Sequence, residues 1–275
     1  MKILVFGHGQ LANFLKDYSA DVVFSTVDIT DRIAVEKELG ASGVQAVINT
    51  TAKTGVDWCQ KNPEETFRVN TLAPYNLYAD CHQRNIFYCQ ISTGCIYYEP
   101  TGLRPVDEEE RPNPKSFYSF TKAWVEELLA GQQNVLILRP RLFISAKPSP
   151  KNLISRWLKM NHFLTNLNSR TIIEDAVPII LKMVQRKITG TFNLVNEGSN
   201  SDYECALILR KIIDTNLVVE KTNIEELNRR LKVPRVSVVL STNKLKNLGL
   251  ALPNFQKSFL KTAKEYKKNL YRDQT

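Results

Sequence analysis

The first residues of this chain decide its fold: positions 3–12 read Ile-Leu-Val-Phe-Gly-His-Gly-Gln-Leu-Ala. The apolar run at 3–6 is typical of a buried strand, and a G-x-G-x-x-A turn directly follows it and opens a helix. Glycine permits a tight turn and lets backbone N–H groups approach a diphosphate at the positive end of a helix. The pattern predicts a dinucleotide site, with a purely structural turn as the alternative. The residues predicted to contact the cofactor here are Gly7, Gly9, Gln10 and Leu11.

Strand-like and helix-like segments alternate through the first half of the chain. Because the strands read as continuous apolar runs, we expect a parallel sheet covered by helices on both faces. The predicted fold class is therefore α/β, a Rossmann-type doubly wound parallel sheet. Further expected strands are 22–24, 46–49, 87–92 and 135–139, and the expected helices are 10–16, 31–39 with Asp31 as its cap, 70–84 and 119–130.

The alternation ends near residue 145, where a proline-rich loop begins. We expect residues 1–145 to form the dinucleotide-binding core. Residues 146–275 are expected to add the last core strand, at 191–194, and a smaller, mostly helical substrate-binding lobe within one compact unit. The expected helices of this second part are 151–161, 174–186, 202–213, 223–231 and 255–270.

Composition excludes several classes of protein. The 275 residues are 43% apolar and 24% charged, which is typical of a globular chain and not of a disordered or collagen-like one. No run approaches the roughly 18 apolar residues of a membrane helix, and the apolar start is too short for a signal peptide. The five cysteines form no CxxC pair and the three histidines are scattered, which argues against disulfides and a metal site. We expect a cytoplasmic protein with no bound metal and no membrane contact.

The net charge of +9 is unevenly distributed, with −4 over residues 1–140 and +13 over residues 141–275. This asymmetry indicates an anionic partner for the second part, either nucleic acid or a small molecule that carries a diphosphate. No nucleic-acid-binding motif accompanies the charge, so we expect no nucleic-acid partner. The lysines at 257, 261, 264, 267 and 268 are spaced like the solvated face of a terminal helix.

Tyr118 and Lys122 lie four residues apart at the start of an expected helix and therefore share one helical face. A lysine ammonium there lowers the pKa of the tyrosine and holds a cofactor ribose, so that the tyrosine can donate a proton to a carbonyl oxygen. Thr93 ends a strand upstream, where such sheets bind ligands, and would hydrogen-bond the carbonyl. The alternative is a surface Tyr–Lys pair and a threonine that caps a helix.

Several motifs in this order resemble the extended short-chain dehydrogenase/reductases. Residues 48–57 (INTTAKTGVD) and 69–77 (VNTLAPYNL) are similar to the dTDP-4-dehydrorhamnose reductase pattern. Residues 92–97 (STGCIY) and 116–129 (SFYSFTKAWVEELL) resemble the bifunctional nucleotide-rhamnose synthase/epimerase-reductases. The resemblance covers most of the chain.

The resemblance implies NADPH or NADH on the sheet and hydride transfer to the C4 keto group of a nucleotide sugar. Tyr118 would be the acid, Lys122 its partner and a cofactor contact, and Thr93 the carbonyl donor. The choice between NADH and NADPH stays open. After the second strand, Ser25, Thr26 and Asp28 are all candidates for the contact with the cofactor ribose, and Asp28 is the predicted one. Further cofactor contacts would be Thr51 and Ala52, and substrate contacts would be Thr54, Asp57, Asn152, Arg156 and Arg235.

Cys95 matches the cysteine that the related epimerase-reductases use to move protons beside the ketone. A thiolate can act as such a base when its pKa is lowered, but packing is the alternative role. The opposite face of the sugar needs an acid, and the position that holds Lys or His in the related enzymes is Arg156 here. Because arginine stays protonated, it is a poor proton donor. Lys159 and His162 could substitute.

The leading hypothesis is an NAD(P)H-dependent reductase of a nucleotide-linked 4-keto-6-deoxyhexose, with or without 3,5-epimerase activity. The alternatives are a dTDP-4-dehydrorhamnose reductase that lacks epimerase activity and a non-catalytic regulatory subunit of the same fold that binds a dinucleotide. The base of the substrate (UDP, dTDP or GDP) stays open, as does the choice between a monomer and a homodimer.

Overall fold

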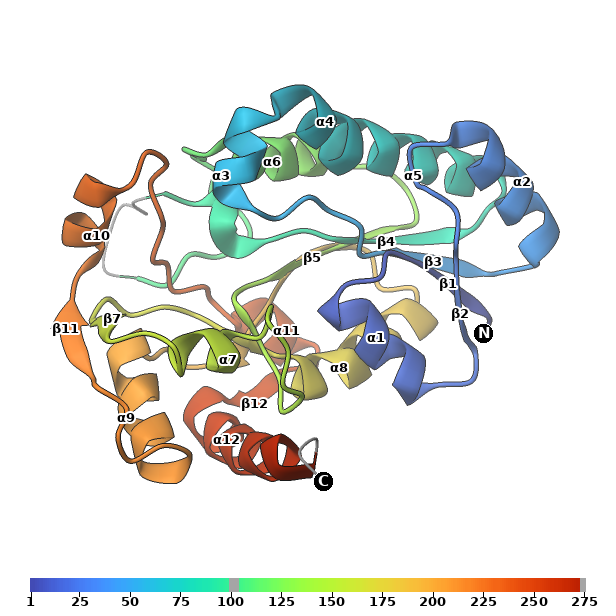
Figure 1. The fold of residues 1–275 in the computed structure, drawn as a ribbon. Coiled ribbons are helices and arrows are strands. Elements are labelled where there is room, and N and C mark those ends of the chain that lie inside the picture. The colour runs from blue at the N-terminus through green and yellow to red at the C-terminus, as the bar shows by residue number, and fades with distance from the viewer. Residues whose placement is uncertain (99–103, 273–275) are drawn as a thin grey trace. The chain divides into compact units, whose positions relative to one another are not determined.

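The computed structural model describes residues 1–98 and 104–272, and its largest sheet has six strands in the order β2-β1-β3-β4-β5-β9 (Figure 1). β1 pairs in parallel with β2 and β3, and β4 pairs in parallel with β3 and β5. The predicted Rossmann-type parallel sheet is confirmed. The strand bounds are β1 Ile3–Phe6, β2 Val22–Phe24, β3 Ala46–Asn49, β4 Phe87–Ile91, β5 Val135–Pro140 and β9 Gly190–Leu194.

The strand order reverses direction between β1 and β3, because the chain passes from β1 outward to β2 and then back across to β3. In open parallel sheets the connections after the strands diverge at this point, and ligands bind there, outside the carboxyl ends of the strands. A ligand is therefore expected beside the segments that follow β1 and β3. The segment that follows β4 lies at the same edge of the sheet, because β4 pairs in parallel with β3.

Helices cover both faces of this sheet. Figure 1 shows α2, α5 and α6 on one face and α1 on the other. Every residue of β1, β3, β4 and β5 is buried, which explains why these strands read as continuous apolar runs. The helix bounds are α1 Gln10–Tyr18, α2 Arg32–Ser42, α5 Ala73–Gln83, α6 Phe117–Leu129 and α8 Ile173–Gln185. One face of the sheet packs Leu4, Phe6, Val47, Tyr88 and Ile137 against Leu39 of α2, Leu77 of α5 and Val125 of α6.

Local sequence explains where α2 begins. The predicted cap Asp31 accepts a hydrogen bond from the backbone N–H of Ala34 (3.1 Å) and starts α2 one residue later. The predicted helix 70–84 is in fact two elements, a five-residue π-helical turn at Arg68–Leu72 and then α5. Two short helices before that turn were not predicted, α3 at Val56–Lys61 and α4 at Pro63–Phe67.

The chain divides into two compact units, and each is made of three segments. The first consists of Met1–Ile96, Arg111–Arg139 and Val177–Phe192, and the second of Tyr97–Glu110, Pro140–Ala176 and Asn193–Thr275. One change of unit falls between Arg139 and Pro140, near the expected limit at residue 145. The assignment of substrate binding to the part after that limit stays a prediction.

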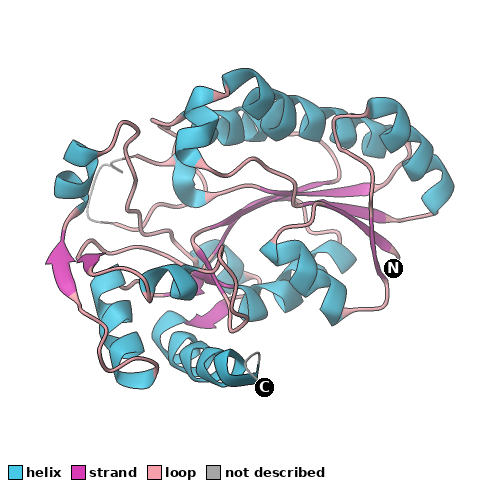
Figure 2. Ribbon diagram, viewed as in Figure 1, coloured by secondary structure: helices cyan, strands magenta, loops and turns pink. Residues whose placement is uncertain are grey.

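The second unit has its own core, in which Trp157, Phe163, Leu209, Phe255 and Phe259 are buried. Beside its helices it holds three two-stranded parallel sheets, β6–β8, β7–β11 and β10–β12, which were not predicted (Figure 2). Its strands are β6 Phe143–Ile144, β7 His162–Leu164, β8 Thr171–Ile172, β10 Asn196–Glu197, β11 Glu220–Thr222 and β12 Leu252–Asn254. Its helices are α7 Leu153–Trp157, α9 Asp202–Ile212, α10 Ile224–Arg230, α11 Asn243–Asn247 and α12 Phe255–Arg272.

Within residues 1–98 and 104–272, no helix is both long enough and apolar enough to cross a membrane. The same residues contain no group of three or more His, Cys, Asp or Glu side chains placed to hold a metal ion.

The buried carboxyl group of Asp80 on α5 is a weak point of the first unit. Its side chain is 1% exposed, neither oxygen has a hydrogen-bond partner, and Arg32 lies 3.7 Å away. Burial raises the pKa of Asp80 above its ordinary value, and the charge of Arg32 opposes that shift only in part. The folded protein therefore binds a proton on the Asp80 carboxyl group more tightly than the unfolded chain does. The stability that this protonation contributes is lost as pH rises through the raised pKa.

Asp80→Asn is accordingly expected to raise the free energy of unfolding at pH 7 by on the order of 1 kcal/mol, because no buried charge remains. The gain should disappear below the ordinary pKa of aspartate, where both side chains are neutral. Urea unfolding of both proteins at pH 7 and in acid measures this difference. Asp21→Asn, at an exposed ion pair with the N-terminus, is the matched control and should change little. A variant that is less stable at pH 7 would contradict the account.

Candidate active site

The glycine turn after β1 is packed closely against the segment that follows β3. Gly7 has φ +108°, and a Cβ at this position would lie 2.4 Å from Thr50 Oγ1 and 3.0 Å from the backbone nitrogen of Thr51. The Thr50 hydroxyl donates to the carbonyl of Phe6 (2.8 Å), which fixes this contact. Only glycine combines this backbone angle with this close approach. The turn thus joins the ends of β1 and β3 at the reversal of strand order.

Gly9, unlike Gly7, has open space around it. A Cβ here would meet no atom within 4 Å, and φ is −80°, which any residue adopts. Gly9 is the cap of α1 and supplies no side-chain acceptor to the N–H groups of the first helical turn. Free space beside the positive end of a nine-residue helix suits a diphosphate, whose oxygens would accept from these N–H groups. The residues present therefore fit the dinucleotide that the sequence predicts.

The other predicted cofactor residues follow β2 and β3. Asp28 is exposed and accepts from both the backbone N–H and the hydroxyl of Thr30 (2.8 Å each), and these bonds lower the pKa of its carboxyl group. Thr51 and Ala52 are half-buried, and the Thr51 N–H donates to Asn49 Oδ1 (3.0 Å). These residues belong to the segments after the strands on either side of β1. Their contact with a cofactor stays a prediction.

The start of α6 holds Tyr118 and Lys122. Ser116 begins this helix because its hydroxyl accepts from the N–H of Ser119 (3.2 Å). Tyr118 is half-buried in the first turn, and Lys122 is 1% exposed one turn later. The Lys122 ammonium donates to the carbonyl of Ile91 (2.8 Å), the last residue of β4. The structure thereby ties the predicted Tyr–Lys face to the carboxyl end of β4.

The buried environment of Lys122 makes its ammonium group easier to deprotonate than that of an exposed lysine. Burial lowers the pKa of Lys122 to about 8, and the nearby carboxylate of Glu126 opposes that shift. The ammonium is therefore largely charged at neutral pH and titrates just above it. A lysine in this state can lower the pKa of a neighbouring phenol at neutral pH and loses that ability in mildly alkaline solution.

Thr93 and Cys95 follow β4 directly. Thr93 is 6% exposed, and its hydroxyl oxygen accepts from the N–H of Cys95 (3.1 Å) at the start of a short 3-10 turn, Gly94–Ile96. Cys95 is half-buried, whereas the other four cysteines are buried. Burial raises the pKa of the thiol in each of those four: Cys59, Cys81, Cys89 and Cys205. Among the five thiols, Cys95 has the environment best suited to chemistry.

Two predicted substrate residues lie in the first unit, in the segment after β3. Thr54 and Asp57 are both exposed, and Asp57 belongs to the first turn of α3. Since β3 pairs with β4, their segment and the Thr93 segment follow neighbouring strands. The structure thus groups the catalytic, cofactor and sugar predictions of this unit at one end of one sheet.

The remaining substrate predictions lie in the second unit. The Asn152 side chain is fully buried, where its amide donates to the carbonyls of Ser145 (2.7 Å) and Lys147 (2.8 Å) and its oxygen caps α7. Arg156 is exposed on the same helix. The Arg235 guanidinium donates to the carbonyl of Val233 (2.7 Å). Asn152 therefore holds its own loop together, and the substrate contacts of all three residues stay predictions.

Asn70 is a buried side chain for which no role was predicted. Its oxygen accepts from the N–H of Lys53 (2.8 Å), and its amide donates to the Lys53 carbonyl (3.0 Å) and to Thr121 Oγ1 (3.2 Å). The next residue, Thr71, donates to the carbonyl of Thr121 (2.9 Å). The π-helical turn at Arg68–Leu72 thus connects the segment after β3 with the residue before Lys122. A polar pair inside an otherwise apolar helical stretch was the available signal.

A second buried network was also missed. Glu126, one turn after Lys122, accepts from the hydroxyl of Ser92 and from Nε (2.8 Å) and Nη2 (2.6 Å) of Arg139 on β5. The available signals were the arginine that ends an apolar strand and the glutamate four residues after Lys122.

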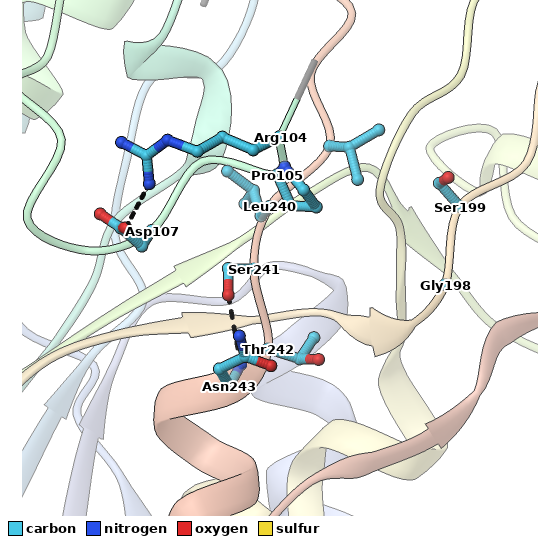
Figure 3. A pocket seen from close by; sticks show the side chains of 10 residues that line it. Arg104, Pro105, Asp107, Gly198, Ser199, Leu240, Ser241, Thr242 and Asn243 are labelled. Carbon is cyan, nitrogen blue, oxygen red and sulfur yellow. Dashed lines mark hydrogen bonds and ion pairs between the residues drawn. The ribbon is translucent and has the colours of Figure 1, made fainter. Parts of the chain in front are cut away.

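The cavity shown in Figure 3 is a separate feature of the second unit. It has a volume of about 380 Å³, and the side chains of Arg104 and Asp107 lie in it, ion-paired at 2.8 Å. The N–H of Asn243 donates to Ser241 Oγ (3.3 Å) beside them. The lining contains none of the predicted site residues, so this cavity is not the site built above.

Known proteins are similar to almost the whole chain. A bifunctional dTDP-4-dehydrorhamnose 3,5-epimerase/dTDP-4-dehydrorhamnose reductase of Arabidopsis thaliana is 30% identical, over 92% of this chain and 87% of that protein. The crystal structure of the L780 UDP-rhamnose synthase of Acanthamoeba polyphaga mimivirus matches with a TM-score of 0.89 and 26% identity, over 96% and 99% of the two chains. That of a dTDP-4-dehydrorhamnose reductase of Clostridium acetobutylicum matches with a TM-score of 0.84 and 25% identity, over 98% and 100%.

A family model described as the RmlD substrate binding domain matches residues 1–268. The predicted resemblance to the extended short-chain dehydrogenase/reductases of rhamnose synthesis is confirmed, as is the oxidoreductase class. The chain belongs to the RmlD substrate-binding domain family.

Proposed function

We propose that this protein is an NADPH- or NADH-dependent reductase of a nucleotide-linked 4-keto-6-deoxyhexose, of the kind that completes a rhamnose-type sugar. The observation that carries the proposal is the bond from the buried Lys122 ammonium to the end of β4, two residues before Thr93, on the helix whose first turn holds Tyr118. The Arabidopsis, mimivirus and Clostridium relatives are named for nucleotide-rhamnose chemistry, which supports the substrate class.

Each residue of the proposed site has a separate role in the reaction. Gly9 and the first turn of α1 would hold the diphosphate of the cofactor, and the bound cofactor would supply the hydride for the ketone carbon. Tyr118 donates its phenolic proton to the C4 oxygen, and Thr93 donates a hydrogen bond to the same oxygen. The ammonium of Lys122, one helical turn after Tyr118, would stabilise the phenolate that this transfer leaves and so would favour the transfer. Mildly alkaline solution is expected to reduce turnover as Lys122 loses its proton.

Oxidation of NADPH by the purified protein tests the reductase directly. Turnover is expected with UDP- or dTDP-linked 4-keto-6-deoxy sugars and not with the corresponding 4-hydroxy sugars. A protein that binds NADPH but reduces none of the UDP-, dTDP- and GDP-linked ketones would instead be the regulatory subunit of the same fold.

A second activity, 3,5-epimerisation, is favoured by the half-buried Cys95 beside Thr93 and by the bifunctional name of the Arabidopsis relative. Turnover in deuterated water is expected to place deuterium at C3 and C5 of the product, since these C–H bonds become acidic beside the ketone. Cys95→Ser should abolish this incorporation and leave reduction of an already epimerised ketone within a few-fold. Mass spectrometry and NMR of the product measure both, with Cys59→Ser as the buried control. If the wild-type protein reduces the ketone without placing deuterium at C3 or C5 of the product, it is a 4-reductase that lacks epimerase activity.

A further inference from the structure

Four polar side chains form a buried group between the sheet and α6. Lys122, Glu126, Arg139 and Ser92 are each at most 5% exposed. Glu126 uses both of its oxygens: Oε1 accepts from the Ser92 hydroxyl, and Oε2 accepts from Nε and Nη2 of Arg139. Removal of Glu126 or Arg139 would leave the other as a buried charge without this ion-pair partner.

The partners of Glu126 come from the elements that carry the predicted catalytic groups. Ser92 precedes Thr93 at the end of β4. Glu126 lies one helical turn after Lys122 and two turns after Tyr118 on α6. Arg139 belongs to β5, which pairs with β4 with Ile91 opposite Leu138. One carboxylate therefore joins the strand end that bears Thr93 to the helix that bears the Tyr–Lys pair.

The charges of the group sum to one positive charge. In the part of the chain that the structure describes, Glu126 contacts Arg139 of β5 and Ser92 of β4, and Lys122 of its own helix lies within electrostatic range. Arg139 compensates Glu126, so the ammonium of Lys122 is stabilised without a net negative charge beside the site. Loss of the Glu126 carboxylate would remove the charge that opposes the effect of burial on Lys122 and would leave the buried Arg139 without its carboxylate partner.

We propose that Glu126 is a positioning residue for the reductase reaction, which keeps Thr93 aligned with Tyr118 and maintains the charge of Lys122. This inference rests on the proposed function. A merely structural ion pair would affect stability and leave the pH dependence of turnover unchanged.

The test compares Glu126→Gln with Glu127→Gln, the adjacent exposed glutamate of the same helix. In Glu126→Gln we expect kcat to fall about 10-fold while KM for the sugar changes less than about 2-fold, because alignment and proton transfer suffer rather than binding. The alkaline limb of the kcat–pH profile should move about one pH unit lower, since Lys122 loses its proton more easily. Glu127→Gln should match the wild type in kcat, in KM for the sugar and in the position of the alkaline limb.

Two further variants keep the test decisive if Glu126→Gln folds poorly. Ser92→Ala removes one bond and retains every charge, so kcat should fall a few-fold with the alkaline limb unmoved. Glu126→Asp retains the carboxylate and should restore the wild-type limb. An unshifted limb in a folded Glu126→Gln protein would overturn the proposal.

NADPH affinity measured by fluorescence across the same pH range separates this proposal from the proposed function. If the wild type reduces no keto sugar, but the pH at which NADPH affinity declines is lower in Glu126→Gln, the reductase assignment fails and the role of Glu126 stands. If the wild type is active and both pH profiles coincide with those of Glu126→Gln, the reductase stands and the role of Glu126 fails.

Discussion

Tyr118→Phe is expected to lower kcat for the reduction of a 4-keto nucleotide sugar by about 100- to 10,000-fold, the range that a positioned acid contributes. The phenol is the proton donor in the proposed reaction, and phenylalanine preserves the ring without the hydroxyl. Because Tyr118 is half-buried in the first turn of a helix capped by Ser116, the variant should fold normally. NADPH affinity should change little, since Tyr118 is not among the predicted cofactor contacts.

Initial rates of NADPH oxidation and a thermal unfolding curve together measure this effect. Tyr18→Phe, at the exposed end of α1, is the matched control and should behave as the wild type does. A folded Tyr118→Phe protein that retains more than about a tenth of wild-type turnover would refute the assignment of Tyr118 as the acid.

Gly7→Ala and Gly9→Ala are expected to fail in different ways, although both change one glycine of the same turn. At Gly7 the added Cβ meets Thr50 and Thr51 at a backbone angle of +108°, so we expect a loss of about 1–3 kcal/mol in the free energy of unfolding. At Gly9 the added Cβ enters open space at an ordinary backbone angle, and stability should be kept. The methyl group would occupy the space proposed for the diphosphate and weaken NADPH binding at least 10-fold.

Chemical unfolding and NADPH titration of both variants separate packing from binding. Gly40→Ala, within α2 and with nothing near its Cβ position, controls for the loss of a glycine as such. If Gly9→Ala bound NADPH as tightly as the wild type, the cofactor would not approach this turn, and the proposed function would lose its cofactor site.

Most strands of the sheet were predictable from the sequence because β1, β3, β4 and β5 are buried on both faces. The strands Ile3–Phe6, Val22–Phe24 and Ala46–Asn49 have the expected bounds. Continuous apolar runs flanked by glycine and polar residues leave few other interpretations. Capping chemistry is equally local, which is why the start of α2 after Asp31 was predicted to the residue.

Short elements escaped prediction for the opposite reason. β6, β8 and β10 have two residues each, so they carry no periodicity and exist only because a distant segment pairs with them. The π-helical turn at Arg68–Leu72 depends likewise on its surroundings, since Asn70 and Thr71 bond Lys53 and Thr121 rather than residues of their own turn. Neither kind of element has a signature in local sequence.

The residue types of the proposed site were readable in the sequence itself: the glycines of the first turn, Thr93 at a strand end, and the Tyr118–Lys122 spacing. Each is specified by local geometry, a backbone angle or the pitch of a helix. Only the tertiary structure decided which groups surround them: that Lys122 is buried against Ile91, that Glu126 unites Ser92 with Arg139, and that Asn152 is occupied within its own loop. The contacts of Lys122 and Glu126 depend on strand pairing and on the packing of α6 against the sheet, which bring residues 13 to 34 positions apart into contact. The sequence determines which chemical group each side chain carries. The neighbours of that group depend on how the chain packs, and its charge state depends on how deeply it is buried.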